Sequence, residues 1–172
     1  QDLDPQGRLR LLYGMRLYRS LRLGLLRSAA LLAPLLLSGC GATLNVVSEG
    51  ADGNLMLGGH DPVAYFTAGR AVPGRAEVKV LHRGATYRFA SEDARRTFIS
   101  APDRFVPRYG GFCAERMAYA VPIPARNDQF RIIGGRLYLF SSARARQFFE
   151  MDQERNLRLG EHYWEAEVRD SN

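Results

Sequence analysis

The feature that most restricts the fold of this chain is a glycine pair between two apolar segments, Phe130–Ile133 and Arg136–Phe140. Both residues of a tight two-residue hairpin loop can require positive φ, which glycine adopts without a steric penalty. Gly134-Gly135 therefore predicts a β-hairpin. A second hairpin is predicted for residues 77–82 and 85–89, where apolar residues alternate with polar ones on either side of Arg83-Gly84.

Helix-start signals follow each hairpin. Ser91, followed by Glu92 and Asp93, predicts the N-cap of a helix through Phe98, and Ser141-Ser142 begins a final helical region that we expect Gly160 to interrupt. Asp61-Pro62 predicts a further short helix, with Asp61 as its cap. The fold class is therefore a small single α+β domain, in which antiparallel hairpins form one sheet packed by short helices and a C-terminal helical region.

Residues 15–39 have the pattern of a bacterial lipoprotein signal peptide. Four arginines precede an apolar run from Ser28 to Leu37, which is too short to span a bilayer as a helix. The run ends in Leu37-Ser38-Gly39-Cys40, which resembles the lipobox whose cysteine is acylated and becomes the mature N-terminus. Residues 1–14 precede this pattern and are interpreted as upstream sequence or a misassigned start.

The lipobox predicts where the protein works. Lipidation of Cys40 would hold the chain on the periplasmic side of a bacterial membrane, and Gly41 in place of an Asp retention signal favours the outer membrane. We expect residues 40–57 to be the lipidated cysteine and a tether, and residues 58–168 to be the domain. Since the chain has two cysteines, Cys113 is left without a disulfide partner in an oxidising compartment.

The charge distribution argues against nucleic-acid binding. Residues 1–39 contain six Arg and two Asp, a net +4 of the chain's total of +6, so residues 40–172 carry only +2. A nucleic-acid-binding domain needs a basic patch on its folded surface. The expected partners are instead the membrane, through the lipid, and an envelope protein or small ligand.

Five motifs in the domain occur in an order and spacing that resemble the YHS-domain family, in its secreted or lipid-anchored bacterial subtype. The similarity to the family core covers residues 59–109, and the longer subtype extends it to Trp164. The motifs are Asp61-Pro62-Val63-Ala64-Tyr65-Phe66, Gly84–Ser91, Phe98 with Pro102, Arg108–Ala114, and Gly135–Leu139.

The resemblance implies a metal-binding module, with copper as the first metal to consider. Members that support this role carry cysteines at the positions of Ala64, Ala90 and Ala94 in this chain. Three methyl groups cannot coordinate a metal. The fold can therefore be expected from the resemblance, whereas the family's thiolate site cannot.

Cys113 is the one thiol of the domain and the first candidate metal ligand. Met117 follows at i+4, on the same face if these residues form a helical turn, and a Cys–Met pair with His60 would suit Cu(I). The alternatives are a thiol nucleophile, for which no feature places a His nearby, and a small buried side chain packed like any other apolar group.

A ligand pocket is the second candidate site. Gly110 and Gly111 would allow a ligand to approach the backbone, and Asp61, Tyr65 and Tyr109 are the side chains that would border it. The alternatives are a helix cap for Asp61, core packing for the tyrosines and a tight turn at the glycines.

These features predict a lipid-anchored periplasmic protein that binds a metal, copper first, or a small ligand, without catalysis. One alternative is a structural or interaction module of the envelope without a bound metal. A thiol-dependent enzyme that uses Cys113 is the other.

Overall fold

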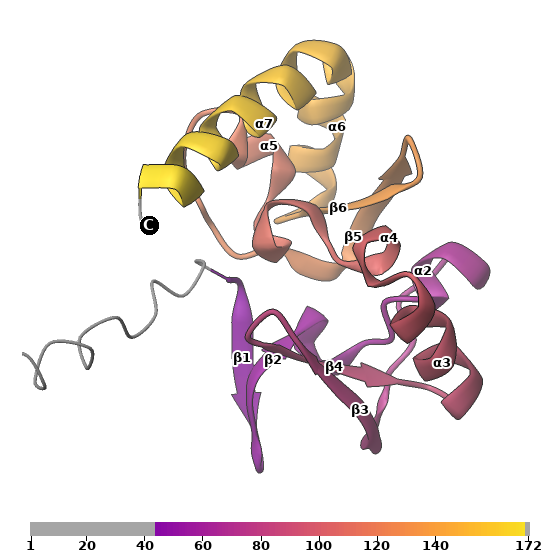
Figure 1. The fold of residues 1–172 in the computed structure, drawn as a ribbon. Helices are drawn as coiled ribbons and strands as arrows, with labels where there is room; N and C mark the ends of the chain where they lie inside the picture. Colours follow the sequence, from indigo (N-terminus) through magenta and orange to yellow (C-terminus); the bar gives the residue numbers. More distant parts are fainter. Residues whose placement is uncertain (1–43, 171–172) are drawn as a thin grey trace, which may run out of the picture. The chain divides into compact units, whose positions relative to one another are not determined.

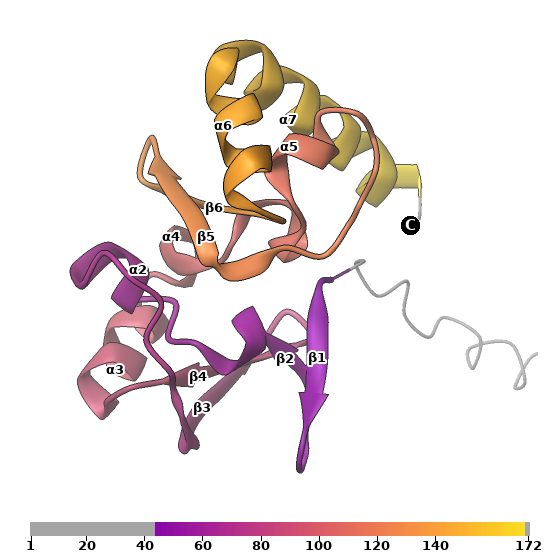
Figure 2. The same ribbon diagram turned by 180° about the vertical axis from the view of Figure 1, so that it is seen from behind.

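The structure is a computed structural model that describes residues 44–170, with side chains through residue 166. The expected signal peptide and Cys40 lie outside the described residues. A four-stranded sheet forms one side of the domain, the helices α5, α6 and α7 form the other, and the β5–β6 hairpin lies between them (Figures 1 and 2).

The larger sheet is mixed, with the strand order β1-β2-β4-β3. Its strands are β1 (Val46–Glu49), β2 (Asp52–Met56), β3 (Arg75–His82) and β4 (Ala85–Phe89). Strands β1–β2 and β3–β4 pair antiparallel, whereas β2 and β4 pair in parallel. Residues 46–56 are thus part of the folded domain, and the expectation that the tether extends to residue 57 is wrong. Leu55 and Met56 are fully buried, which explains why this short segment is held in the sheet.

Both predicted hairpins are confirmed, but they do not share a sheet. Strand β5 (Arg126–Ile133) pairs only with β6 (Arg136–Phe140), in a separate two-stranded sheet. The prediction of one antiparallel sheet is wrong for a physical reason. The free edge of β4 is taken by β2, while isolated bridges Pro107–Leu137 and Cys113–Leu139 occupy the other side of β6.

The domain has two hydrophobic cores, and β6 contributes to both. Successive side chains of a strand point to opposite faces, so Leu137 and Leu139 enter the first core, and Tyr138 and Phe140 enter the second. The first core also contains Met56, Leu57, Val63, Tyr65, Val78, Ala85, Tyr87, Phe89, Phe98 and Phe105. The second also contains Tyr109, Phe112, Cys113, Ala114, Met117, Ala145 and Phe149.

Serine caps begin the two middle-length helices, as expected. Ser91 Oγ accepts a hydrogen bond from the Ala94 amide, and Ser142 Oγ accepts one from the Ala145 amide. The helices are α2 (Ala64–Thr67), α3 (Glu92–Ser100), α4 (Pro102–Phe105), α5 (Ala114–Met117), α6 (Ala143–Met151) and α7 (Gln153–Asp170), with 3-10 turns η2 (Leu57–Gly59) and η3 (Arg108–Gly111).

Asp61 joins the start of α2 to the end of β4. Its carboxylate accepts hydrogen bonds from the Val63 amide at 2.8 Å and the Ala90 amide at 2.9 Å. The side chain is 2% exposed. Both carboxylate oxygens therefore satisfy backbone donors of the turn before α2 and of the residue after β4. The N-cap of α2 is Val63, so the expected helix start at Asp61-Pro62 is two residues too early.

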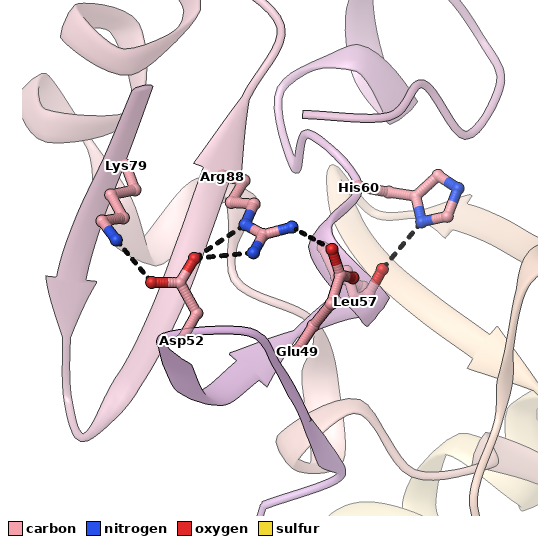
Figure 3. Close-up of polar contacts among 6 residues, drawn as sticks. All are labelled: Glu49, Asp52, Leu57, His60, Lys79 and Arg88. Atoms are coloured by element: carbon pink, nitrogen blue, oxygen red, sulfur yellow. Dashed lines mark hydrogen bonds and ion pairs between the residues drawn. The ribbon is translucent and has the colours of Figure 1, made fainter. Parts of the chain in front are cut away.

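An ion network centred on the buried Asp52 and Arg88 connects the strands of the larger sheet (Figure 3). The Asp52 carboxylate accepts hydrogen bonds from Lys79 Nζ at 2.5 Å and from Arg88 Nε at 2.8 Å, and Arg88 also pairs with Glu49 at 2.9 Å. The hydrogen bonds from Lys79 and then Arg88 hold the pKa of Asp52 below its ordinary value, so this carboxylate stays charged at neutral pH. The network ties β2 to β3 and β4 and to the end of β1.

Helix α7 continues through Gly160, so the expected interruption there is wrong. The packing around position 160 explains why the residue there is glycine. A Cβ at this position would lie 2.7 Å from Tyr109 Oη and 2.9 Å from its Cζ. Gly160 is thus the point at which the helix can approach the buried Tyr109 ring, and this close approach offsets the weak helix propensity of glycine.

We therefore expect Gly160→Ala to lower the free energy of unfolding of the full chain by about 1–3 kcal/mol, because the added methyl overpacks the Tyr109 contact. At an unhindered helix position the same change would stabilise by about 1 kcal/mol. Urea unfolding followed by circular dichroism measures the difference. In a Tyr109→Phe background, which lacks the nearest atom, the penalty should be smaller. A stabilising Gly160→Ala would contradict this account.

Candidate functional site

The segment Tyr109-Gly110-Gly111 makes a left-handed turn between the two cores. All three residues have positive φ, at 54°, 56° and 85°. Glycine adopts this region freely, but Tyr109 is there at a steric cost that its burial in the second core must offset. Two hydrogen bonds fix the turn to the residue before β1: the Asn45 amide donates to Gly110 O at 2.9 Å, and Asn45 Nδ2 donates to Gly111 O at 2.8 Å.

A cavity of about 650 Å³ adjoins this turn, within the size range of small-molecule sites. Its walls come from the start of the fold, from the β3–β4 and β5–β6 turns, from the α4–η3 segment and from α7. The lining residues are Leu44, Met56, Arg83, Tyr87, Asp103, Arg104, Val106, Pro107, Arg108, Tyr109, Gly110, Gly134, Gly135, Arg136 and Trp164.

Four arginines and one aspartate line this cavity. Arg83 pairs with Asp103 at 2.9 Å, and Arg108 pairs with Glu161 of α7. Arg104 and Arg136 have no carboxylate partner within residues 44–166. Both of these arginines are exposed to solvent, so the cavity wall has an excess of positive charge at its open side.

Buried polar atoms accompany these arginines. Arg108 Nε and Tyr109 Oη are shielded from solvent and have no hydrogen-bond partner in the described part of the chain. Burial, and next the charge of Glu161, raise the pKa of Tyr109 and of Tyr138, whereas Arg108 acts in the opposite direction on both. Arg136 also lowers the pKa of Tyr138, which places both arginines within electrostatic reach of that phenol.

Cys113 is enclosed in the second core. It is 0% exposed, and its Sγ donates to Ser141 Oγ at 3.4 Å. It precedes α5 directly, and the Met117 amide donates to its carbonyl at 3.0 Å. Met117 is in the same core at 1% exposure. The structure thus brings these two sulfur-containing residues into one apolar cluster, where the surrounding aromatic rings offer no further metal ligand.

His60 lies elsewhere, on the segment that enters α2 (Figure 3). Its Nδ1 hydrogen-bonds with the Leu57 carbonyl at 2.9 Å, and its backbone forms an isolated bridge with Pro73. No group of three or more His, Cys, Asp and Glu residues suited to a metal ion occurs in the range 44–166. The donor set of the described residues therefore does not fit the copper site that the family resemblance implies.

Of the five residues predicted to border a ligand pocket, the structure places two at the cavity and three elsewhere. Tyr109 and Gly110 line the cavity. Gly111 is not among the lining residues, and a Cβ there would meet Met56 Sδ at 3.1 Å. The Asp61 carboxylate accepts from the Val63 and Ala90 amides, and Tyr65 donates to the Asn127 carbonyl at 2.9 Å while its ring packs on Phe130. These last two serve the first core rather than the cavity.

A second hollow, of about 490 Å³, is bordered by α5 and α6 and the start of α7. Its charged lining residues are Glu115, Arg116, Asp152 and Arg155, so its formal charges cancel. The arginine-lined cavity, with its excess of positive charge and its buried aromatic wall, is the better candidate site.

Sequence reasoning did not find the arginines of the cavity or Trp164. Arg104 follows a proline turn, and Arg136 follows the glycine pair within the motif Gly135–Leu139, to which the sequence assigns no binding role of its own. Their proximity to one cavity arises from tertiary packing. The one available signal was indirect, namely that several arginines adjoin predicted turns.

Comparisons with protein-family models, with curated proteins and with solved structures returned no match for this chain. Within residues 44–170, none of the helices combines the length and the apolarity required to cross a bilayer.

The burial of Cys113 predicts a protected thiol. In a Cys40→Ser variant of the full chain, Cys113 is the one remaining cysteine. We expect its alkylation by iodoacetamide at neutral pH to be at least about a hundredfold slower in the folded chain than in denaturant, because the thiol is reached only through opening of the second core. Rapid alkylation of the folded chain would contradict this and favour a thiol nucleophile.

Proposed function

We propose that this chain is a lipid-anchored protein of the bacterial envelope that binds a small ligand in the arginine-lined cavity and does not catalyse a reaction. The observation that carries the proposal is the cavity itself. It has the volume of a small-molecule site, a mixed apolar and polar lining, and unbalanced guanidinium groups beside a buried aromatic wall.

The structure's details favour a small ligand over copper. The buried Cys113 sulfur hydrogen-bonds with Ser141, and His60 is engaged by the Leu57 carbonyl in another part of the fold. The three alanines at the family's cysteine positions point the same way. The similarity of the motifs to YHS-domain proteins supports the assignment to a binding module, and the cavity supplies a site that does not need thiolates.

The proposed location is the periplasmic side of the membrane, with the outer membrane favoured. Its support is the sequence of the leader: arginines, then an apolar run, then Leu37–Cys40. The folded domain begins within a few residues of the proposed anchor, since β1 starts at Val46. A domain on so short a tether would work close to the bilayer surface.

We expect the full chain, expressed in a Gram-negative bacterium, to incorporate labelled palmitate and to fractionate with membranes. Cys40→Ser should abolish the label, because the acyl chains need this thiol. Cys113→Ser is the matched control and should keep the label, since its sulfur is buried in the domain. Equal labelling of the Cys40→Ser variant and the unaltered chain would overturn the anchor.

Ligand binding can be followed through Trp164, which is the chain's single tryptophan and lines the cavity. In a screen of anionic, neutral and cationic small molecules, we expect ligands of the full chain in detergent to change the Trp164 emission. At a concentration a hundredfold above Kd they should also stabilise the fold by about 2.7 kcal/mol.

Trp164→Phe provides the control, because it removes the optical signal while a true ligand should still raise the unfolding temperature. If no compound of any charge changes emission or unfolding temperature, the cavity is not a ligand site and the proposal fails.

A further inference from the structure

We propose that the ligand of the arginine-lined cavity is an organic phosphate monoester, whose phosphate pairs with Arg104 and Arg136 and whose body packs on the apolar wall. This inference rests on the proposed function, since it assumes that the cavity takes a small molecule, and it adds the chemical class of that molecule.

The charge of the cavity wall favours an anionic ligand, although Arg104 and Arg136 are both exposed to solvent. Two of the four lining arginines are neutralised, Arg83 by Asp103 and Arg108 by Glu161. The other two, Arg104 and Arg136, have no acidic partner in residues 44–166. A dianion would balance this excess, and a phosphate monoester carries about −1.5 to −2 charges near neutral pH.

Arg104 and Arg136 are positioned by the separate elements to which they belong. Arg104 belongs to α4, where its guanidinium lies 5.5 Å from the centroid of the Phe105 ring. Arg136 begins β6 immediately after the Gly134-Gly135 turn, and both of these glycines have positive φ. Each guanidinium presents a planar set of N–H donors suited to phosphate oxygens.

The remainder of the lining is apolar and can hold the ester's organic part. Leu44, Met56, Val106 and Pro107 contribute aliphatic surface, and Tyr87 and Trp164 contribute aromatic surface. Inorganic phosphate would leave this surface unused. Burial of even a short alkyl chain contributes about 0.8 kcal/mol per methylene, so an alkyl ester should bind more tightly than the free ion.

The test is a titration of the full chain in detergent with butyl phosphate, inorganic phosphate, butanol and the dicarboxylate adipate, followed by calorimetry and Trp164 emission. We expect butyl phosphate to bind most tightly, inorganic phosphate more weakly and butanol not detectably. Arg104→Gln and Arg136→Gln should each weaken butyl phosphate by about tenfold or more, since each removes a charged hydrogen-bonding partner.

Arg70→Gln is the matched control, because Arg70 is exposed and is not part of the cavity wall. It should bind butyl phosphate like the unaltered chain, and all three variants should unfold at similar temperatures. Equal weakening by Arg70→Gln would reveal general charge attraction and overturn the assignment. Tighter binding of adipate would overturn the phosphate in favour of a dicarboxylate.

Failure of this inference can be distinguished from failure of the proposed function. If butanol or another neutral compound binds and changes Trp164 emission while butyl phosphate does not, the cavity is a ligand site but not one for phosphate esters. If Arg104→Gln and Arg136→Gln leave butyl phosphate affinity unchanged, the phosphate is not held by this pair and the inference is wrong.

Discussion

Strand β6 is buried on both faces, and the arrangement of the whole domain depends on this constraint. Leu137 and Leu139 complete the core beneath the mixed sheet, while Tyr138 and Phe140 complete the core beneath α6 and α7. A shift of one residue in its pairing would exchange these two sets of side chains. The glycine pair before β6 sets the register of its hairpin with β5, so one short turn determines which side chains enter which core.

The left-handed turn at residues 109–111 has a related role between the same two cores. Asn45 binds the carbonyls of Gly110 and Gly111, while the Tyr109 ring is enclosed by Tyr138 and Trp164 at centroid distances of 5.7 and 6.2 Å. The strained tyrosine backbone is therefore held from two directions. The candidate cavity lies beside this turn, with a wall that combines Arg108, the turn itself and Trp164.

Local signals in the sequence were sufficient for the hairpins and the serine-capped helices because turn chemistry and capping act over a few residues. Ser91 and Ser142 accept the hydrogen bonds that their positions predicted, and both Arg83-Gly84 and Gly134-Gly135 adopt positive φ. Residues 46–56 were harder to assign because their segment is short and partly exposed, and its pairing with β4 joins distant parts of the chain. The prediction that Gly160 interrupts the last helix fails for a similar reason, since the residue it packs on, Tyr109, is remote in sequence.

In the candidate site, too, some features follow from the local sequence and others from contacts between distant parts of the chain. The stretch around Tyr109 and Gly110 drew attention from sequence alone because consecutive glycines imply an unusual backbone. The arginines that give the cavity its charge come from α4, η3, the β3–β4 turn and the start of β6, and the fold brings them to one place. Cys113, the most conspicuous residue in the sequence, is explained by packing and by its hydrogen bond with Ser141.

The last helix of the domain also bears on when the cavity comes into existence. Gly160, Glu161 and Trp164 all belong to α7, and they respectively admit the Tyr109 ring, neutralise Arg108 and close the aromatic wall. During synthesis the strands of the mixed sheet emerge before this wall. A chain that lost α7 to premature termination or proteolysis would keep the residues of its sheet but lack a finished cavity. Binding of the proposed ligand would therefore require that α7 is present and folded.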